Sequence, residues 1–361
     1  GFDSEPTRRN VIGVAAAYPE IAKQGVLLRK YGQEVIRHVS GKRIHGTGAI
    51  PGGMNKALST AERDELRRDI DQMIAWSRDA VHLVKRMHDT NPAFYNGFGD
   101  VPSALMGMVD SSGALDLYHG GLTAKNADGE LIFDKADYST YQSLLQEEVK
   151  PWSYMKFPHI KSLGAEAGWY KVGPLARVQT CNRIPTPMAE AERLDMLAIG
   201  GGKPVHGALV YHWARLIETL HTTEVIRDLL DDPDITGTDL MALGGERQRE
   251  AIGVIEAPRG TLFHHYRVDD NDLVTYCNLI VSTTNNNQAM NESIRHVARQ
   301  FLNGRELTEG LLNHIEIAIR AYDPCLSCAT HALGKMALEV DLVDAGGQLI
   351  DSMRRGGDCA L

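Results

Sequence analysis

The sequence lacks the features of a membrane protein and of a nucleic-acid-binding protein. Its 361 residues include no run of the about 18 to 20 apolar residues that a bilayer span needs, and charged residues interrupt the first thirty where a signal peptide has its apolar core. Lys and Arg number 38 against 47 Asp and Glu, and no basic block is long enough to follow a phosphate backbone. We therefore expect a cytoplasmic protein with no membrane span and no nucleic-acid partner.

Cysteine is scarce, and the chain also lacks internal repeats and low-complexity segments, which argues against a solenoid. A disulfide framework is not expected in so large a chain with an odd number of cysteines. The chain begins Gly-Phe-Asp without an initiating Met, and we interpret it as a fragment. The five cysteines are Cys181, Cys277, Cys325, Cys328 and Cys359.

Long amphipathic helices dominate the hydrophobic pattern. Ser59 followed by Glu62 is the signature of a capping box, and apolar residues then recur at helical spacing to about residue 88. Comparable patterns cover 25–39, 208–230 and 288–320, the last with a break near its Asn-Gly pair. Antiparallel packing of such helices would bury their apolar faces.

Strand signals form two smaller patches. Segments 104–118 and 131–133 flank the turn cluster 126–129 and predict a small meander or hairpin, and segments 261–268 and 273–281 predict a second hairpin. We therefore expect a mainly α protein with small β elements (α+β) and a long-helix bundle core, rather than a doubly wound sheet.

Two glycine-rich stretches fail as nucleotide-binding motifs. Segment 46–51 has Pro where the third Gly of a dinucleotide fingerprint belongs, and segment 200–204 has Pro after its Lys, where a phosphate loop needs Ser or Thr. We interpret both as turns and expect any nicotinamide or flavin to be bound by a partner.

One cysteine pair has the spacing of metal ligands. Cys325 and Cys328 are three residues apart and His331 follows three residues later, so two sulfurs and an imidazole can converge on one metal. Pro324 disfavours helical conformation in Asp323, so the helix predicted upstream ends before the pair. On spacing alone, a zinc half-site, an iron–sulfur ligand pair, a redox dithiol and inert buried thiols all remain open.

The residues around this pair resemble the catalytic large subunits of nickel–iron hydrogenases. Asp-Pro-Cys-Leu-Ser-Cys-Ala-Thr-His at 323–331 is similar to their C-terminal metal-binding motif, and Glu-Ala-Pro-Arg-Gly-Thr-Leu-Phe-His-His-Tyr at 256–266 is similar to the segment with the arginine above the metals. Val-Ser-Thr-Thr-Asn-Asn at 281–286 is a third, weaker match. The resemblance covers essentially the whole chain and is greatest to the soluble cytoplasmic members coupled to nicotinamide or deazaflavin cofactors.

The resemblance implies a nickel–iron centre. Cys325 would be a terminal ligand of nickel, and Cys328 would bridge nickel to an iron that carries cyanide and carbon monoxide. His331 would be the last residue of the mature protein and would help to bind a magnesium or other divalent ion.

Four further residues take roles from the same resemblance. Arg259 would face one cyanide and the space where H2 is split, with Pro258 beside it in the cofactor-binding segment, and Asp323 would pair with Arg259. Thr283 would donate to the other cyanide. Alternatively, Arg259 is an ordinary buried arginine paired with Glu256, and Thr283 belongs to a simple loop.

The adjacent His264 and His265 point to opposite faces of the predicted strand, so at least one of them is expected to be structural.

The implied activity is the reversible heterolysis of H2 to protons and electrons by an oxidoreductase. Because the chain has too few cysteines to hold iron–sulfur clusters, we expect a small iron–sulfur subunit, together with flavin-containing diaphorase subunits, to carry electrons to NAD(P) or another soluble carrier. The alternatives are a metal-free scaffold or electron-relay subunit of the respiratory-complex type, and a zinc-binding interaction protein that uses Cys325, Cys328 and His331.

The sequence departs from the family pattern at both ends. The N-terminal Arg-x-Cys-Gly-x-Cys motif and a proton-transferring glutamate are absent, and we favour a missing N-terminal segment over a degenerate, metal-free descendant. At the other end, residues 1–331 would form the catalytic body and 332–361 an extension that a maturation endopeptidase removes. The sequence is therefore expected to be a precursor.

Overall fold

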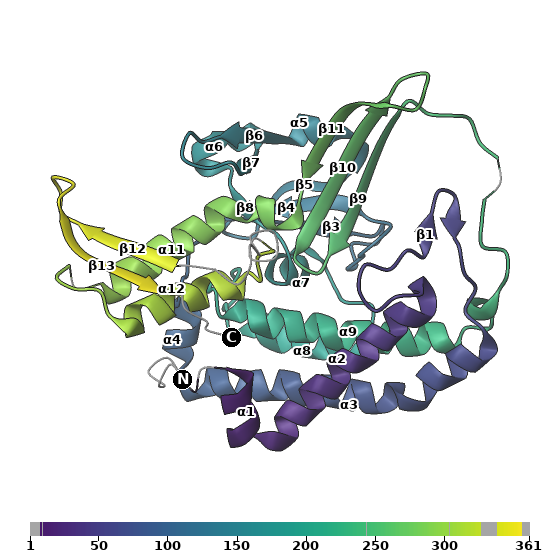
Figure 1. Cartoon of the computed structure of the whole chain (residues 1–361), viewed down its shortest axis with the longest axis horizontal. Coiled ribbons are helices and arrows are strands. Elements are labelled where there is room, and N and C mark those ends of the chain that lie inside the picture. Colours follow the sequence, from purple (N-terminus) through teal and green to yellow (C-terminus); the bar gives the residue numbers. More distant parts are fainter. Residues whose placement is uncertain (1–7, 9, 243, 303, 326–337, 356–361) are drawn as a thin grey trace.

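A computed structural model describes residues 8, 10–242, 244–302, 304–325 and 338–355. Figure 1 shows long helices along one side of the molecule and several small sheets on the other. This arrangement confirms the prediction of a mainly α fold with small β elements. In the part of the chain that the structure describes, no helix is both long enough and apolar enough to cross a membrane.

The helical side is built on α3 (Thr60–Thr90) and α9 (Val210–Asp231), which pack side by side (Figure 1). Arg67, near the start of α3, pairs with Asp231 at the end of α9 at 2.6 Å, so the two helices run antiparallel as predicted. Helices α2 (Pro19–Ser40) and α8 (Pro187–Ala198) pack against this pair. The shared core includes Ile70, Met73, Ile74, Val81, Ala214, Ile217 and Leu220.

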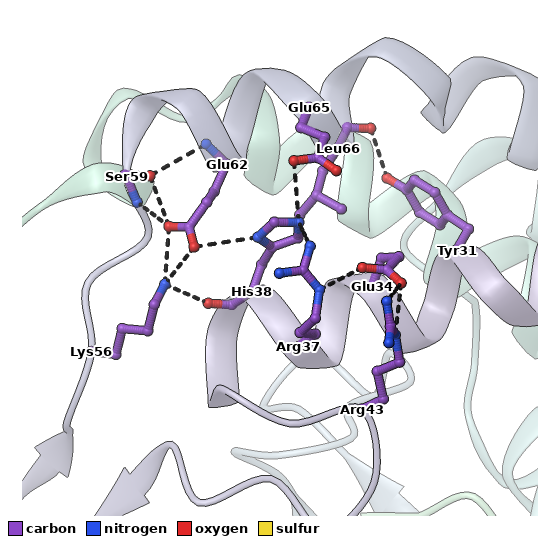
Figure 2. A network of polar contacts seen from close by, with 10 residues as sticks. All are labelled: Tyr31, Glu34, Arg37, His38, Arg43, Lys56, Ser59, Glu62, Glu65 and Leu66. Carbon is purple, nitrogen blue, oxygen red and sulfur yellow. Dashed lines mark hydrogen bonds and ion pairs between the residues drawn. The ribbon is translucent and has the colours of Figure 1, made fainter.

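A polar network ties the end of α2 to the start of α3 (Figure 2). The predicted capping box is present, because the Ser59 side chain accepts from the Glu62 backbone and the Glu62 carboxylate accepts from the Ser59 backbone. Lys56 Nζ donates to both Glu62 oxygens, at 2.8 and 2.9 Å, and to the His38 carbonyl at 2.8 Å. Tyr31 Oη donates to the Leu66 carbonyl at 2.9 Å, so the helices are joined at two levels.

The four-stranded sheet has the order β5-β4-β3-β8, formed by β5 (Leu131–Ala136), β4 (Gly121–Lys125), β3 (Ala104–Val109) and β8 (Tyr170–Lys171). Strand β8 is parallel to β3, and the other pairs are antiparallel.

The predicted strand 104–118 was too long. Strand β3 ends at Val109, because the Asp110 carboxylate accepts from the backbone of Ser112 and Ala114 and closes a turn. The strand that enters the 126–129 turn is β4, which the sequence pattern did not predict.

A second sheet has the order β11-β10-β9. The predicted hairpin is confirmed as β10 (Gly260–Val268) and β11 (Val274–Ile280). Strand β9 (Glu250–Ala257) was not predicted, because its pairing with β10 defines it and its own sequence pattern does not. On β10 the His265 side chain is buried and His264 is half-buried, as their opposite orientations predicted.

The C-terminal part contains α10 (Ser282–Asn285), α11 (Asn287–Phe301) and α12 (Glu309–Ala321), followed by the hairpin β12 (Leu338–Val343) and β13 (Leu349–Arg355). The predicted break in 288–320 lies between α11 and α12. The remaining elements are short: α1 (Val11–Ala17), β1 (Ala49–Ile50), β2 (Gly53–Met54), α4 (Pro92–Gly97), α5 (Tyr141–Leu144), β6 (Leu145–Val149), β7 (Lys156–Ile160), α6 (Gly164–Ala167) and α7 (Pro174–Thr180), with 3-10 turns at Tyr138–Thr140, Lys161–Leu163 and Pro233–Thr236.

The cap of α3 should depend on pH. The hydrogen bond from Lys56 and those from Ser59 hold the pKa of Glu62 well below its usual range, so this stabilisation is present above about pH 4.5 and is lost as the pH falls towards the lowered pKa. Glu62→Gln should lower the free energy of unfolding by about 1 kcal/mol at pH 7. The gap between the melting temperatures of the two proteins should narrow as the pH falls below about 4.5. Asp64→Asn, which removes an exposed carboxylate bonded to Arg63, serves as the control, and a gap that stayed constant with pH would contradict the assignment.

Candidate functional site

The chain leaves α12 in a backbone conformation that few residues adopt. Helix α12 ends at Ala321, as the proline at 324 predicted, and Asp323 has a φ of 53°, in the left-handed region. Such a conformation costs free energy, so it requires contacts that hold it in place. Arg259 provides them: its Nε donates to the Asp323 carbonyl at 2.5 Å and lies 3.2 Å from Asp323 Oδ2. The expected pairing of Asp323 with Arg259 is therefore present.

Arg259 lies in the tight turn between β9 and β10. Gly260 has a φ of 134°, and a Cβ there would lie 2.2 Å from Val172 Cγ2, so glycine is required for the turn to approach β8. The alternative pairing of Arg259 with Glu256 is wrong. The Glu256 carboxylate instead accepts from Arg177 at 2.8 Å and from the Met108 backbone at 3.0 Å.

Arg177 holds this turn in place through a buried ion network. Its guanidinium is 2% exposed and donates to Glu218 at 2.6 and 2.7 Å and to Glu256 at 2.8 Å. It also donates to the carbonyls of Ala257, at 2.7 Å, and Pro258, at 3.3 Å, immediately before Arg259. Burial opposes the charge on Arg177, but the two carboxylates outweigh it and hold its pKa well above the ordinary value. Arg177 thus positions Pro258, whereas Arg259 makes the contacts with Asp323.

Sequence reasoning missed this network. Its three charged members come from α7, α9 and β9, and no local spacing brings them together. The only signal in the sequence is that Glu256 belongs to the segment carrying Arg259.

Thr283 lies beside the cysteine segment. It is in α10 rather than in a simple loop, is 3% exposed, and its Oγ1 accepts from the Cys325 backbone N–H at 3.2 Å. The structure therefore brings Thr283, Cys325, Asp323 and Arg259 into one cluster, although they lie in three separate segments of the sequence.

Cys325 is the one predicted metal ligand that the structure describes; Cys328 and His331 lie outside the described residues. Its thiol is free and half-buried. Within the described ranges, no three His, Cys, Asp or Glu side chains form a group that would hold a metal ion. A soft sulfur ligand at this position fits nickel or iron.

A cavity of about 330 Å³ adjoins the cluster. Its lining includes Asp323, Pro258, the Arg177–Glu218–Glu256 network and Gly32 of α2. Charged groups therefore meet an accessible space next to the cysteine segment.

The remaining described cysteines lie elsewhere. Cys181 is buried in the helical core, where burial raises the pKa of its thiol to about 11. Cys277 is exposed on β11.

Comparison with known proteins identifies the family to which the chain belongs. The model of the family described as nickel-dependent hydrogenase matches residues 113–331, which include Arg259, Thr283 and the Cys325 segment. The chain belongs to the nickel-dependent hydrogenase family. This match and the relatives described next show that the chain is an oxidoreductase.

Two hydrogenase chains from other organisms are similar in sequence to this chain. The chain is 44% identical over 364 residues to the NAD-reducing hydrogenase HoxS subunit beta of Cupriavidus necator, an alignment that covers 98% of this chain and 74% of the relative. It is 37% identical over 354 residues to a chain of the F420-non-reducing hydrogenase vhc of Methanococcus voltae, with 96% and 74% covered.

Solved structures agree. An NAD+-reducing [NiFe]-hydrogenase in the H2-reduced state superposes with a TM-score of 0.88 at 50% identity, covering 92% of this chain and 73% of that chain. The Ni-Fe-Se hydrogenase from D. vulgaris Hildenborough, at 20% identity and a TM-score of 0.64 over 86% of this chain and 70% of that chain, shares the fold. The helical bundle with small sheets is thus the large-subunit fold of nickel-dependent hydrogenases.

The buried ion network should be essential for stability. Arg177→Met would leave the carboxylates of Glu218 and Glu256 buried without their cation, so the free energy of unfolding should fall by about 3 to 5 kcal/mol. Chemical denaturation measures this loss. Arg249→Met, which removes an exposed arginine bonded to Asp270, should change stability by less than about 1 kcal/mol, and similar losses in the two variants would contradict the proposed importance of the network.

Proposed function

We propose that this chain carries the nickel–iron centre of a hydrogenase and catalyses the reversible reaction H2 ⇌ 2 H⁺ + 2 e⁻. The observation that carries the proposal is the convergence of Arg259, Asp323, Thr283 and Cys325 from distant segments, inside the range that the family model matches. Cys325 and Cys328 would supply sulfur ligands, with cyanide and carbon monoxide on the iron. His331 would help to hold a magnesium ion.

When bound, the nickel–iron centre would supply Lewis-acid and redox chemistry to H2. The chain's own residues organise the space beside it. Asp323 orients the Arg259 guanidinium through its carbonyl and its carboxylate, which leaves the cation fixed beside the cysteine segment. A cation held in this way stabilises negative charge that develops nearby, with no reorganisation during the reaction. Pro258, fixed through its carbonyl by Arg177, would exclude water from the same space.

We further propose that electrons leave through iron–sulfur clusters of a small partner subunit, then reach NAD(P) or another soluble carrier through flavin-containing diaphorase subunits. With NAD as acceptor, the overall reaction is H2 + NAD⁺ → NADH + H⁺. The names of the NAD-reducing relative and of the NAD+-reducing structure support this route. Since these carriers are solutes of the cytoplasm, we infer that the assembly works there.

Residues 332–361 would be removed by a maturation endopeptidase after His331, leaving residues 1–331 as the catalytic body. Two observations support this proposal. The family model ends at residue 331. The β12–β13 hairpin also forms a two-stranded sheet of its own, and its Leu342 joins a small apolar cluster with Leu307, Leu311 and Ile315 that is distinct from the main core.

Cys325→Ser tests the metal assignment. In the natively purified complex, we expect the wild type to contain nickel and iron in about equal amounts and to show cyanide and carbonyl stretches in the infrared, because the family centre carries those ligands. The variant should lose the nickel, the infrared bands and H2 oxidation, because a hydroxyl is a poor ligand for a soft metal. Cys277→Ser, on an exposed strand away from the cluster, should retain all three.

Other results would favour the alternatives. A well-folded wild-type complex with neither nickel nor infrared bands would indicate a scaffold subunit. Zinc as the only metal would indicate a zinc-binding interaction protein.

The mass of the chain tests the processing step. Nickel-loaded protein should lack residues 332–361, whereas chain produced without nickel should retain them. Intact-mass spectrometry distinguishes the two forms, and nickel-loaded protein that still contains Leu361 would contradict the proposal.

A further inference from the structure

A second arginine, Arg215, contacts the segment that leads to Cys325. Arg215 projects from α9 and its Nη2 donates to the Ala321 carbonyl at 2.9 Å. Ala321 is the last residue of α12, where helix carbonyls have no partner inside the helix and where the helix dipole favours a cation. Arg215 therefore binds the end of the helix from which the cysteine segment departs.

Arg215 and Arg259 bind the backbone on either side of Tyr322. Arg215 binds the carbonyl of Ala321, and Arg259 binds the carbonyl of Asp323. Between them, Tyr322 is anchored in the core, with its Oη 2.8 Å from Ser293 Oγ and its ring 4.7 Å from that of Tyr211. These four contacts thus determine the path of the backbone just before Pro324.

The surroundings of Arg215 explain why an arginine is needed. Its Nη1 lies 3.2 Å from His212 Nδ1, so one planar guanidinium spans the histidine and the helix end. Burial, followed by the charge of Arg215, lowers the pKa of His212 to about 4, so at neutral pH the Nδ1 accepts this hydrogen bond. A lysine at this position has a single nitrogen and cannot make both contacts in the same geometry.

The environment of Arg215 is also costly. Burial lowers its pKa, and no carboxylate among the described residues forms a close ion pair with it, although Asp323 and Glu218 attract it at longer range. Arg215 lines the 330 Å³ cavity together with Asp323 and Pro258. A half-buried cation without a close counter-ion is expensive to keep, and its hydrogen bond to the Ala321 carbonyl offsets part of that cost.

We propose that Arg215 is a positioning residue for Cys325. It holds the end of α12 so that Asp323 adopts its left-handed conformation, faces Arg259 and presents the Cys325 backbone to Thr283. This inference rests on the proposed function, in which Cys325 is a metal ligand. Without Arg215, the Ala321–Asp323 backbone has one anchor fewer, and Cys325 loses its defined position.

The reactivity of Cys325 tests the proposal without any metal. The full chain is produced without nickel as the wild type, Arg215→Gln, Arg215→Lys and the control Arg227→Gln, which alters a half-buried arginine of the same helix bonded to Asp228. Each protein is treated with iodoacetamide, and modification of Cys325 is followed by fragmentation mass spectrometry of the tryptic peptide 321–335, which separates Cys325 from Cys328. Cys277 in the same sample measures reagent activity, and Cys181 measures global opening.

We expect Cys325 to react about tenfold faster in Arg215→Gln, because loss of one charge-assisted hydrogen bond allows the segment to open. Arg215→Lys should give an intermediate rate, since its ammonium can still donate to the Ala321 carbonyl. Arg227→Gln should match the wild type. In the metal-loaded complex, Arg215→Gln should also retain less nickel than the wild type.

Two outcomes would overturn the proposal. One is a wild-type rate for Cys325 in a folded Arg215→Gln protein. The other is an equal acceleration of Cys181, which would show a general loss of packing. Failure of the proposed function would appear separately, as a wild-type complex without nickel, whatever the alkylation rates.

Discussion

The buried contact of Arg177 with Glu218 and Glu256 is the interaction on which the site depends. It joins α7, α9 and β9 at one point, and the same guanidinium binds the two carbonyls that precede Arg259. A buried charge is tolerated only when it is fully paired, so the three elements have little freedom to shift relative to one another. The position of the Arg259 turn therefore follows from the packing of the helical side against the sheets.

The second constraint is the backbone at the end of α12. Pro324 prevents the helix from continuing, and Asp323 then takes a left-handed conformation that must be stabilised by contacts. Arg259 and Arg215 bind carbonyls on either side of Tyr322, and Thr283 accepts from the Cys325 backbone. The cysteine segment is thus held by side chains of three other elements, which suits a ligand that must meet a metal in one orientation.

Much of the fold was predictable because its signals are local. The capping box of Ser59 and Glu62, the hairpin of β10 and β11, and the end of α12 before Pro324 each depend on a few neighbouring residues. Predictions failed where distant partners decide. Strand β9 forms by pairing with β10. Strand β3 ends before the predicted residue because the Asp110 carboxylate accepts hydrogen bonds from the backbone N–H groups of Ser112 and Ala114.

The sequence by itself determined the family resemblance and the residue types of the site, because soft sulfur ligands and an adjacent proline leave a recognisable local pattern. It also named Asp323 as the partner of Arg259, on the basis of that resemblance. Only the tertiary structure decided that Glu256 belongs to Arg177, that Thr283 lies against Cys325, and that Arg215 holds the end of α12. Each of these contacts joins residues more than 40 positions apart, and no spacing rule in a single chain encodes which distant side chains share one buried space.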